Sequence, residues 1–71
     1  MEFTAQNVGS RIRTLRLERG ISLRTFALMV NLDKSHLSRI ERGEVDLKVN
    51  SLGKIISGLG MSPEEFFAWR G

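Results

Sequence analysis

The side chains best able to recognise a chemical partner lie between residues 33 and 43. Four polar side chains share one side of a short predicted helix: Lys34, Ser35, Ser38 and Arg39. Leu37 and Ile40, three residues apart, form its apolar side. Arg39 can donate a bidentate pair of hydrogen bonds to guanine O6 and N7, and Lys34 can reach the same atoms as a point donor. This helix is therefore suited to reading base edges in the major groove of DNA.

A second short helix precedes it and completes a predicted helix-turn-helix over residues 22–43. Ser22 is a favourable N-cap for this first helix, and Asn31 tolerates the left-handed conformation that closes it. Asp33 caps the following helix, and Gly43 ends it. The two helices are thus separated by a tight turn.

Three further helices and no strand are expected. The first runs from about Gln6 to Arg19, and another from about Asn50 to Gly60. The last begins at Ser62, with Pro63 in its first turn and Glu65 closing a capping box. Glycines within the predicted helices cost on the order of 1 kcal/mol each relative to alanine. Close approach by another backbone would explain them at three positions: Gly9, Gly53 and Gly58.

Length and charge set further bounds. Seventy-one residues allow one small domain, and the absence of cysteine excludes disulfides and thiolate-bound zinc. The net charge is +3, but residues 1–43 hold eight Lys and Arg against four Asp and Glu, so positive charge gathers on the helix-turn-helix half. No signal peptide or long apolar run is evident, and we expect a cytoplasmic protein without membrane association.

Catalysis is not expected. His36 is the one side chain suited to act as a base at neutral pH, and Ser38 diverges from it on the same helix. Glu64 and Glu65 are explained by a helix start. No set of metal ligands converges, so we predict no enzyme activity, metal, cofactor or small-molecule ligand.

From Val8 to Phe67 the chain resembles the Cro/C1-type (XRE) helix-turn-helix regulators. The matching segments include Arg19-Gly-Ile-Ser22, Phe26-Ala27 and Leu37-Ser-Arg-Ile-Glu-Arg-Gly43. Residues 31–34, 46–52 and 66–67 look most like restriction–modification controller proteins. The resemblance implies an all-α, five-helix lambda-repressor-like domain that spans residues 1–71.

The resemblance also implies roles for individual residues. It places Lys34, Ser35 and Arg39 at base-reading positions, with His36 and Ser38 beside them. It matches Arg16 and Glu41 to a structural ion pair between the first helix and the recognition helix. Leu23 departs from the family, which commonly has a phosphate-binding Gln at this position. Phosphate contacts are expected from donors on both sides of the groove: Ser22, Arg24, Arg42, Lys48 and Arg13.

We expect the chain to bind an inverted-repeat operator in double-stranded DNA as a homodimer, acting as a repressor or a concentration-dependent switch. Controller-like relatives pair through their last two helices, which implies a dimerisation region at 45–71. Phe66, Phe67 and Trp69 are candidate interface residues, with core filling as the alternative for the two phenylalanines. Two other functions stay open: a DNA-binding antitoxin, for which Leu28 and Met29 would form a patch for its toxin, and an adaptor without DNA binding.

Overall fold

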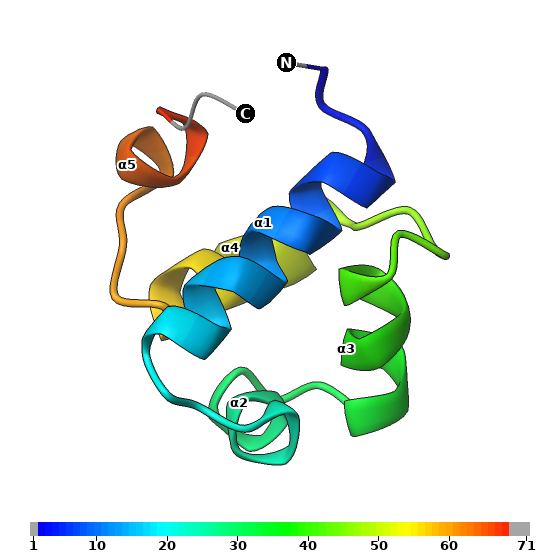
Figure 1. Cartoon of the computed structure of the whole chain (residues 1–71), viewed down its shortest axis with the longest axis vertical. Coiled ribbons are helices and arrows are strands. Elements are labelled where there is room, and N and C mark those ends of the chain that lie inside the picture. Colours follow the sequence, from blue (N-terminus) through cyan, green and yellow to red (C-terminus); the bar gives the residue numbers. More distant parts are fainter. Residues whose placement is uncertain (1, 69–71) are drawn as a thin grey trace.

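The computed structural model describes residues 2–68, which form five α-helices and no strand (Figure 1). In chain order they are α1 (Ala5–Glu18), α2 (Leu23–Met29), α3 (Lys34–Glu41), α4 (Val49–Gly58) and α5 (Pro63–Phe67). The predicted all-α class is confirmed. None of these helices is long and apolar enough to cross a membrane.

Local hydrogen bonds fix most helix ends where the sequence predicts them. Ser22 Oγ accepts from the Thr25 N–H at 3.1 Å, and the Ser62–Glu65 capping box is complete. Asn31 has φ of 57°, in the left-handed region, and so closes α2 as expected. Asp33 occupies the N-cap position of α3, but its side chain makes no capping hydrogen bond.

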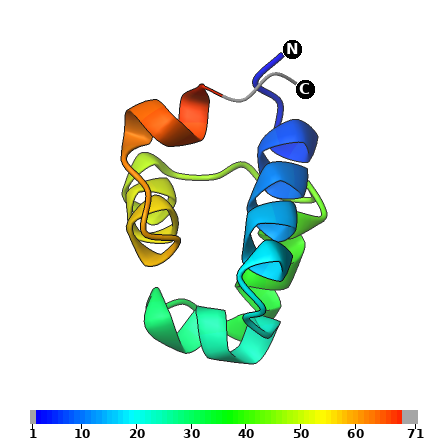
Figure 2. The same cartoon turned by 60° about the vertical axis from the view of Figure 1, so that its left-hand side comes forward.

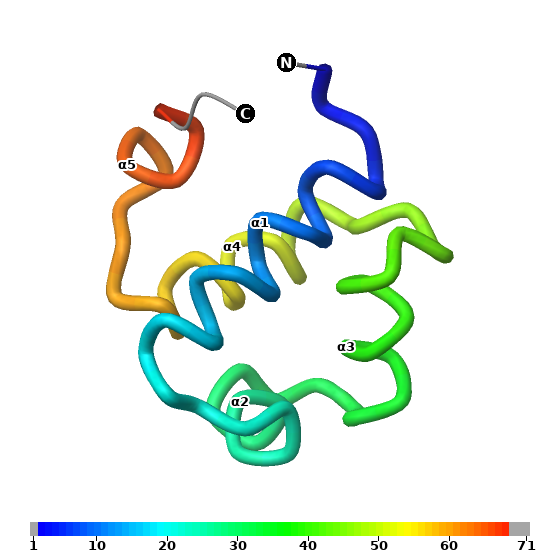
Figure 3. The backbone as a smooth tube through the Cα atoms, viewed as in Figure 1, coloured from blue at the N-terminus to red at the C-terminus, as the bar shows by residue number. Residues whose placement is uncertain are grey.

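The core receives at least one fully buried side chain from every helix. Five residues have no exposed surface, one on each of α1 to α5: Ile12, Phe26, Leu37, Ile55 and Phe66. Figure 2 shows α4 and α5 on one side of this core, α1 and α3 on the other, and α2 closing one end. The loop between α3 and α4 passes the N-terminal end of α1, as the tube in Figure 3 shows. Every helix thus faces the same small interior.

The three helical glycines differ in what surrounds them. A Cβ on Gly9 would collide with the carbonyl oxygen of Ile40 on α3, so close backbone approach explains this glycine. A Cβ on Gly58 would lie 2.5 Å from Val30 Cγ1. This glycine therefore faces a neighbouring side chain and not the backbone of another element. Nothing lies within 4 Å of the position for Gly53, and the expectation of close approach is wrong there. Gly9 allows α1 and α3 to pack closely, which positions the predicted recognition helix.

Candidate nucleic-acid interface

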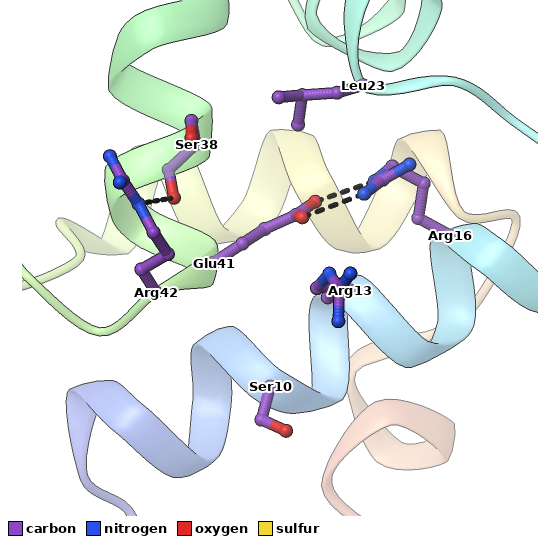
Figure 4. Close-up of a pocket in the computed structure, with 7 residues that line it drawn as sticks. All are labelled: Ser10, Arg13, Arg16, Leu23, Ser38, Glu41 and Arg42. Atoms are coloured by element: carbon purple, nitrogen blue, oxygen red, sulfur yellow. Dashed lines mark hydrogen bonds and ion pairs between the residues drawn. The ribbon is translucent and has the colours of Figure 1, made fainter.

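A buried ion pair joins α3 to α1. Arg16 Nε donates to Glu41 Oε2 at 2.8 Å, and Arg16 Nη2 donates to Glu41 Oε1 at 3.0 Å (Figure 4). Arg16 Nη1 also donates to the carbonyl of Ile21 at 2.8 Å. The two charged side chains are only 7% and 4% exposed. The hydrogen bond to Glu41 raises the pKa of Arg16 above its usual value. The pair therefore fixes the C-terminal end of α3 on the rest of the fold.

Helix α3 presents its apolar side to the core and its polar side outward. Leu37 and Ile40 are 0% and 2% exposed. One cleft, which we call the α3 cleft, is bordered by six residues: Leu23, Lys34, Ser35, Ser38, Arg39 and Arg42. Lys34, Ser35 and Arg39 are exposed there, and Ser38 is half-buried. The fold therefore brings four of the five predicted base-contacting residues to one surface.

His36 is the exception among those five. It borders a different hollow, together with residues of α2 and of the turn that follows: Ala27, Leu28, Asn31, Leu32 and Asp33. Each helical residue is rotated by about 100° from the one before it. Three residues make about 300°, so His36 lies only about 60° around the axis from Arg39, and its place beside α2 separates it from the α3 cleft. The structure does not bring it to the α3 cleft.

The predicted phosphate-contacting residues fall into separate groups. Arg13 on α1 and Arg42 after α3 border one hollow beside the Arg16–Glu41 pair (Figure 4). Arg42 also lies 3.2 Å from an oxygen of Glu44 in an exposed ion pair, which a phosphate would have to displace.

The other three predicted phosphate ligands lie outside that hollow. Arg24 is exposed in the first turn of α2, and Lys48 is exposed at the N-cap position of α4. The Ser22 hydroxyl both donates to Thr25 Oγ1 and accepts from the Thr25 N–H, so it is engaged within the chain. A phosphate contact from Ser22 would require this local pair to rearrange.

The structure separates the predicted interface aromatics. Phe66 is fully buried in the chain's own core, so its assignment to a dimer surface is corrected to core filling. Phe67 is 40% exposed and packs edge-on against both Phe3 and Phe66. Trp69 lies outside the described residues. Of the two described phenylalanines, Phe67 is the one with surface free for a partner.

Two structural arginines were missed from the sequence. Arg19 Nε donates to the carbonyl of Leu59 at 2.8 Å, linking the ends of α1 and α4. The guanidinium carbon of Arg11 lies 5.6 Å from the centroid of the Phe66 ring, within reach of a cation–π interaction. Neither partner is a neighbour in sequence, so no local pattern could indicate these contacts. Part of the predicted basic surface is thereby used to hold the fold.

Comparison with known proteins agrees with this geometry. The family described as helix-turn-helix matches residues 12–66. The control protein C.MunI of a Mycoplasma species is 34% identical over 61 residues, covering 84% of this chain and 82% of that protein.

Solved structures of controller proteins are similar over nearly the whole chain. The restriction–modification controller protein C.AhdI from Aeromonas hydrophila is 32% identical with a TM-score of 0.84, covering 89% of this chain and 96% of its own. The controller protein C.Esp1396I, solved as a tetramer with its natural 35 base-pair operator, is 35% identical with a TM-score of 0.87, covering 96% and 90%. This chain therefore belongs to the Cro/C1-type helix-turn-helix family and is similar to restriction–modification controller proteins.

Proposed function

We propose that this chain is a sequence-specific DNA-binding transcriptional regulator that binds an inverted-repeat operator as a homodimer. It is a regulator and not an enzyme. The proposal rests above all on α3, whose polar side borders an open cleft while its apolar side is buried. The operator-bound relative supports the same function.

Lys34, Ser35 and Arg39 are proposed to contact bases, and the half-buried Ser38 borders the same cleft. Arg39 supplies the strongest discrimination, because its planar guanidinium matches guanine O6 and N7. His36 borders another hollow and is not included in this proposal. Arg13, Arg24, Arg42 and Lys48 are proposed to contact phosphates and set register.

A homodimer is proposed because one α3 covers too few base pairs for useful specificity. The dimerisation region is proposed at residues 45–71, where Phe67 offers an exposed aromatic ring. Two recognition helices related by a two-fold axis would then meet half-sites about one DNA turn, ~34 Å, apart. Because its proposed partner is DNA, we also propose that the chain acts in the cytoplasm of a bacterial cell.

The test is selection of bound sequences from random duplex DNA, followed by affinity measurements at two salt concentrations, about 50 and 200 mM. We expect enrichment of an inverted repeat and a steep loss of affinity with salt. Binding without enrichment would reduce the function to nonspecific attraction by a basic surface. Absence of binding would favour the adaptor function instead.

Variants of basic residues test the assigned roles on the selected operator. Arg39→Ala is expected to cost ~1–3 kcal/mol in binding and to relax preference at one base pair. Lys48→Ala should weaken all sequences about equally and reduce the salt slope by about one. Lys54→Ala, which removes an exposed charge from α4 outside the α3 cleft, is the control, and sedimentation verifies that it still dimerises because Lys54 lies in the proposed dimerisation region. Unchanged affinity and preference in Arg39→Ala would contradict the placement of α3 in the groove.

A further inference from the structure

Leu23 is an apolar residue at the edge of an otherwise polar surface. It is the first residue of α2, and it is half-buried against the core. Among the described residues, the others that border the α3 cleft all have cationic or hydroxyl-bearing side chains. Leu23 also borders the neighbouring hollow that holds Arg13 and Arg42 (Figure 4). It therefore lies between proposed base-reading and phosphate-contacting residues.

The Leu23 side chain cannot bind a phosphate, because leucine has neither a charge nor a hydrogen-bond donor. The base edges in the major groove present one apolar group, the C5 methyl of thymine. An apolar side chain within a cleft of donors can bury that methyl while its neighbours bind polar atoms of adjacent bases. We infer that Leu23 is a specificity-determining residue that contacts a thymine methyl in each half-site. This inference rests on the proposed DNA-binding function.

Leu23 has a second, structural role that any test must separate from this one. Its side chain lines the same hollow as the Arg16–Glu41 pair (Figure 4). Truncation to alanine would admit water to the pair as well as remove the apolar contact. Loss of DNA affinity in Leu23→Ala is thus insufficient by itself. The decisive change has to be made in the DNA.

The experiment replaces each thymine of one selected half-site, in turn, with deoxyuridine, which removes the methyl and keeps every base-pairing atom. Wild-type protein, Leu23→Ala and Leu28→Ala are titrated against each duplex. Leu28 is the matched control, because it is an apolar residue of the same helix, 78% exposed, and outside the α3 cleft. Thermal melting followed by circular dichroism verifies that each variant is folded.

One thymine is expected at which methyl removal weakens wild-type binding by about three- to fivefold, the effect of losing one buried methyl. Leu28→Ala should retain this sensitivity, and Leu23→Ala should lose it. Specific binding in which wild-type protein and Leu23→Ala respond alike to every deoxyuridine would overturn the inference and leave the proposed function intact. Absence of any sequence preference would overturn both.

Discussion

The buried pair of Arg16 and Glu41 supports a prediction about stability. Replacement of Arg16 by methionine removes two hydrogen bonds to Glu41 and one to the Ile21 carbonyl. Hydrogen bonds to charged groups contribute roughly 1.5–3 kcal/mol each, and the Glu41 side chain, 4% exposed, would be left charged without a partner. We expect a loss of about 3–5 kcal/mol, as for other broken buried pairs. Because domains of this kind unfold at a cost of only about 5–15 kcal/mol, the variant should be only marginally folded.

Urea unfolding followed by circular dichroism measures this loss of stability. The protein concentration is held fixed, because dimerisation adds to the apparent stability. Together with the single variant Glu41→Leu, the double variant Arg16→Met, Glu41→Leu completes a thermodynamic cycle. It should recover most of the lost stability, since an apolar pair removes the uncompensated charge. The unpaired carbonyl of Ile21 should leave a residual cost of about 1–3 kcal/mol.

The size of the loss in Arg16→Met tests whether the Arg16–Glu41 pair is buried. If Arg16→Met costs less than about 1 kcal/mol, the pair behaves as an exposed ion pair and does not hold α3 in place. If the loss of stability in the double variant equals the sum of the two single losses, the coupling energy between Arg16 and Glu41 is zero and the charge argument fails. DNA preference in the folded double variant then reports whether α3 keeps its orientation without the pair.

Three further predictions concern packing, acid sensitivity and assembly. Gly9→Ala should destabilise the fold by about 1–3 kcal/mol because the added Cβ meets the backbone of α3. Gly53→Ala has open space around it and should stabilise α4 by up to ~1 kcal/mol. Chemical unfolding of both variants measures this difference. The hydrogen bond from the Ser62 backbone N–H lowers the pKa of the Glu65 carboxyl. The contribution of Glu65 to stability is therefore present above the pKa of the unfolded chain, 4.5, and is lost as the pH falls through the lower pKa of the folded chain. Thermal melts of Glu65→Gln should therefore decline less in acid than those of the wild type, and parallel declines would refute this. Phe67→Ser should weaken the dimer in sedimentation experiments without unfolding the chain. Phe66→Ala, which removes a fully buried ring, should instead cost about 3–5 kcal/mol of stability. If both variants change dimerisation and stability equally, Phe67 is not an interface residue distinct from the core residue Phe66.

The sequence by itself determined most of the positions where the helices begin and end. Ser22, Asn31, Gly43 and the Ser62–Glu65 capping box act on backbone groups within a few residues, so their effect can be predicted from local chemistry. The apolar spacing on α3 is equally local and predicted which side of this helix is buried. The all-α fold follows from these short-range rules.

Only the tertiary structure decided which side chains share a surface. It placed His36 in a different hollow from Arg39, although both lie on α3. It enclosed Phe66 while leaving part of Phe67 exposed. These outcomes depend on the angles at which helices from distant parts of the sequence meet.

The same reason explains the contacts that sequence patterns did not indicate. Arg19 reaches a carbonyl forty residues away, and Gly9 faces α3 while Gly53 faces open space. Amphipathic spacing defines a buried side for each helix, but the partner of each residue on that side is set by packing among all five helices. The recognition helix could therefore be found from the sequence, whereas its cleft, with Leu23 at the edge, is a product of the assembled fold.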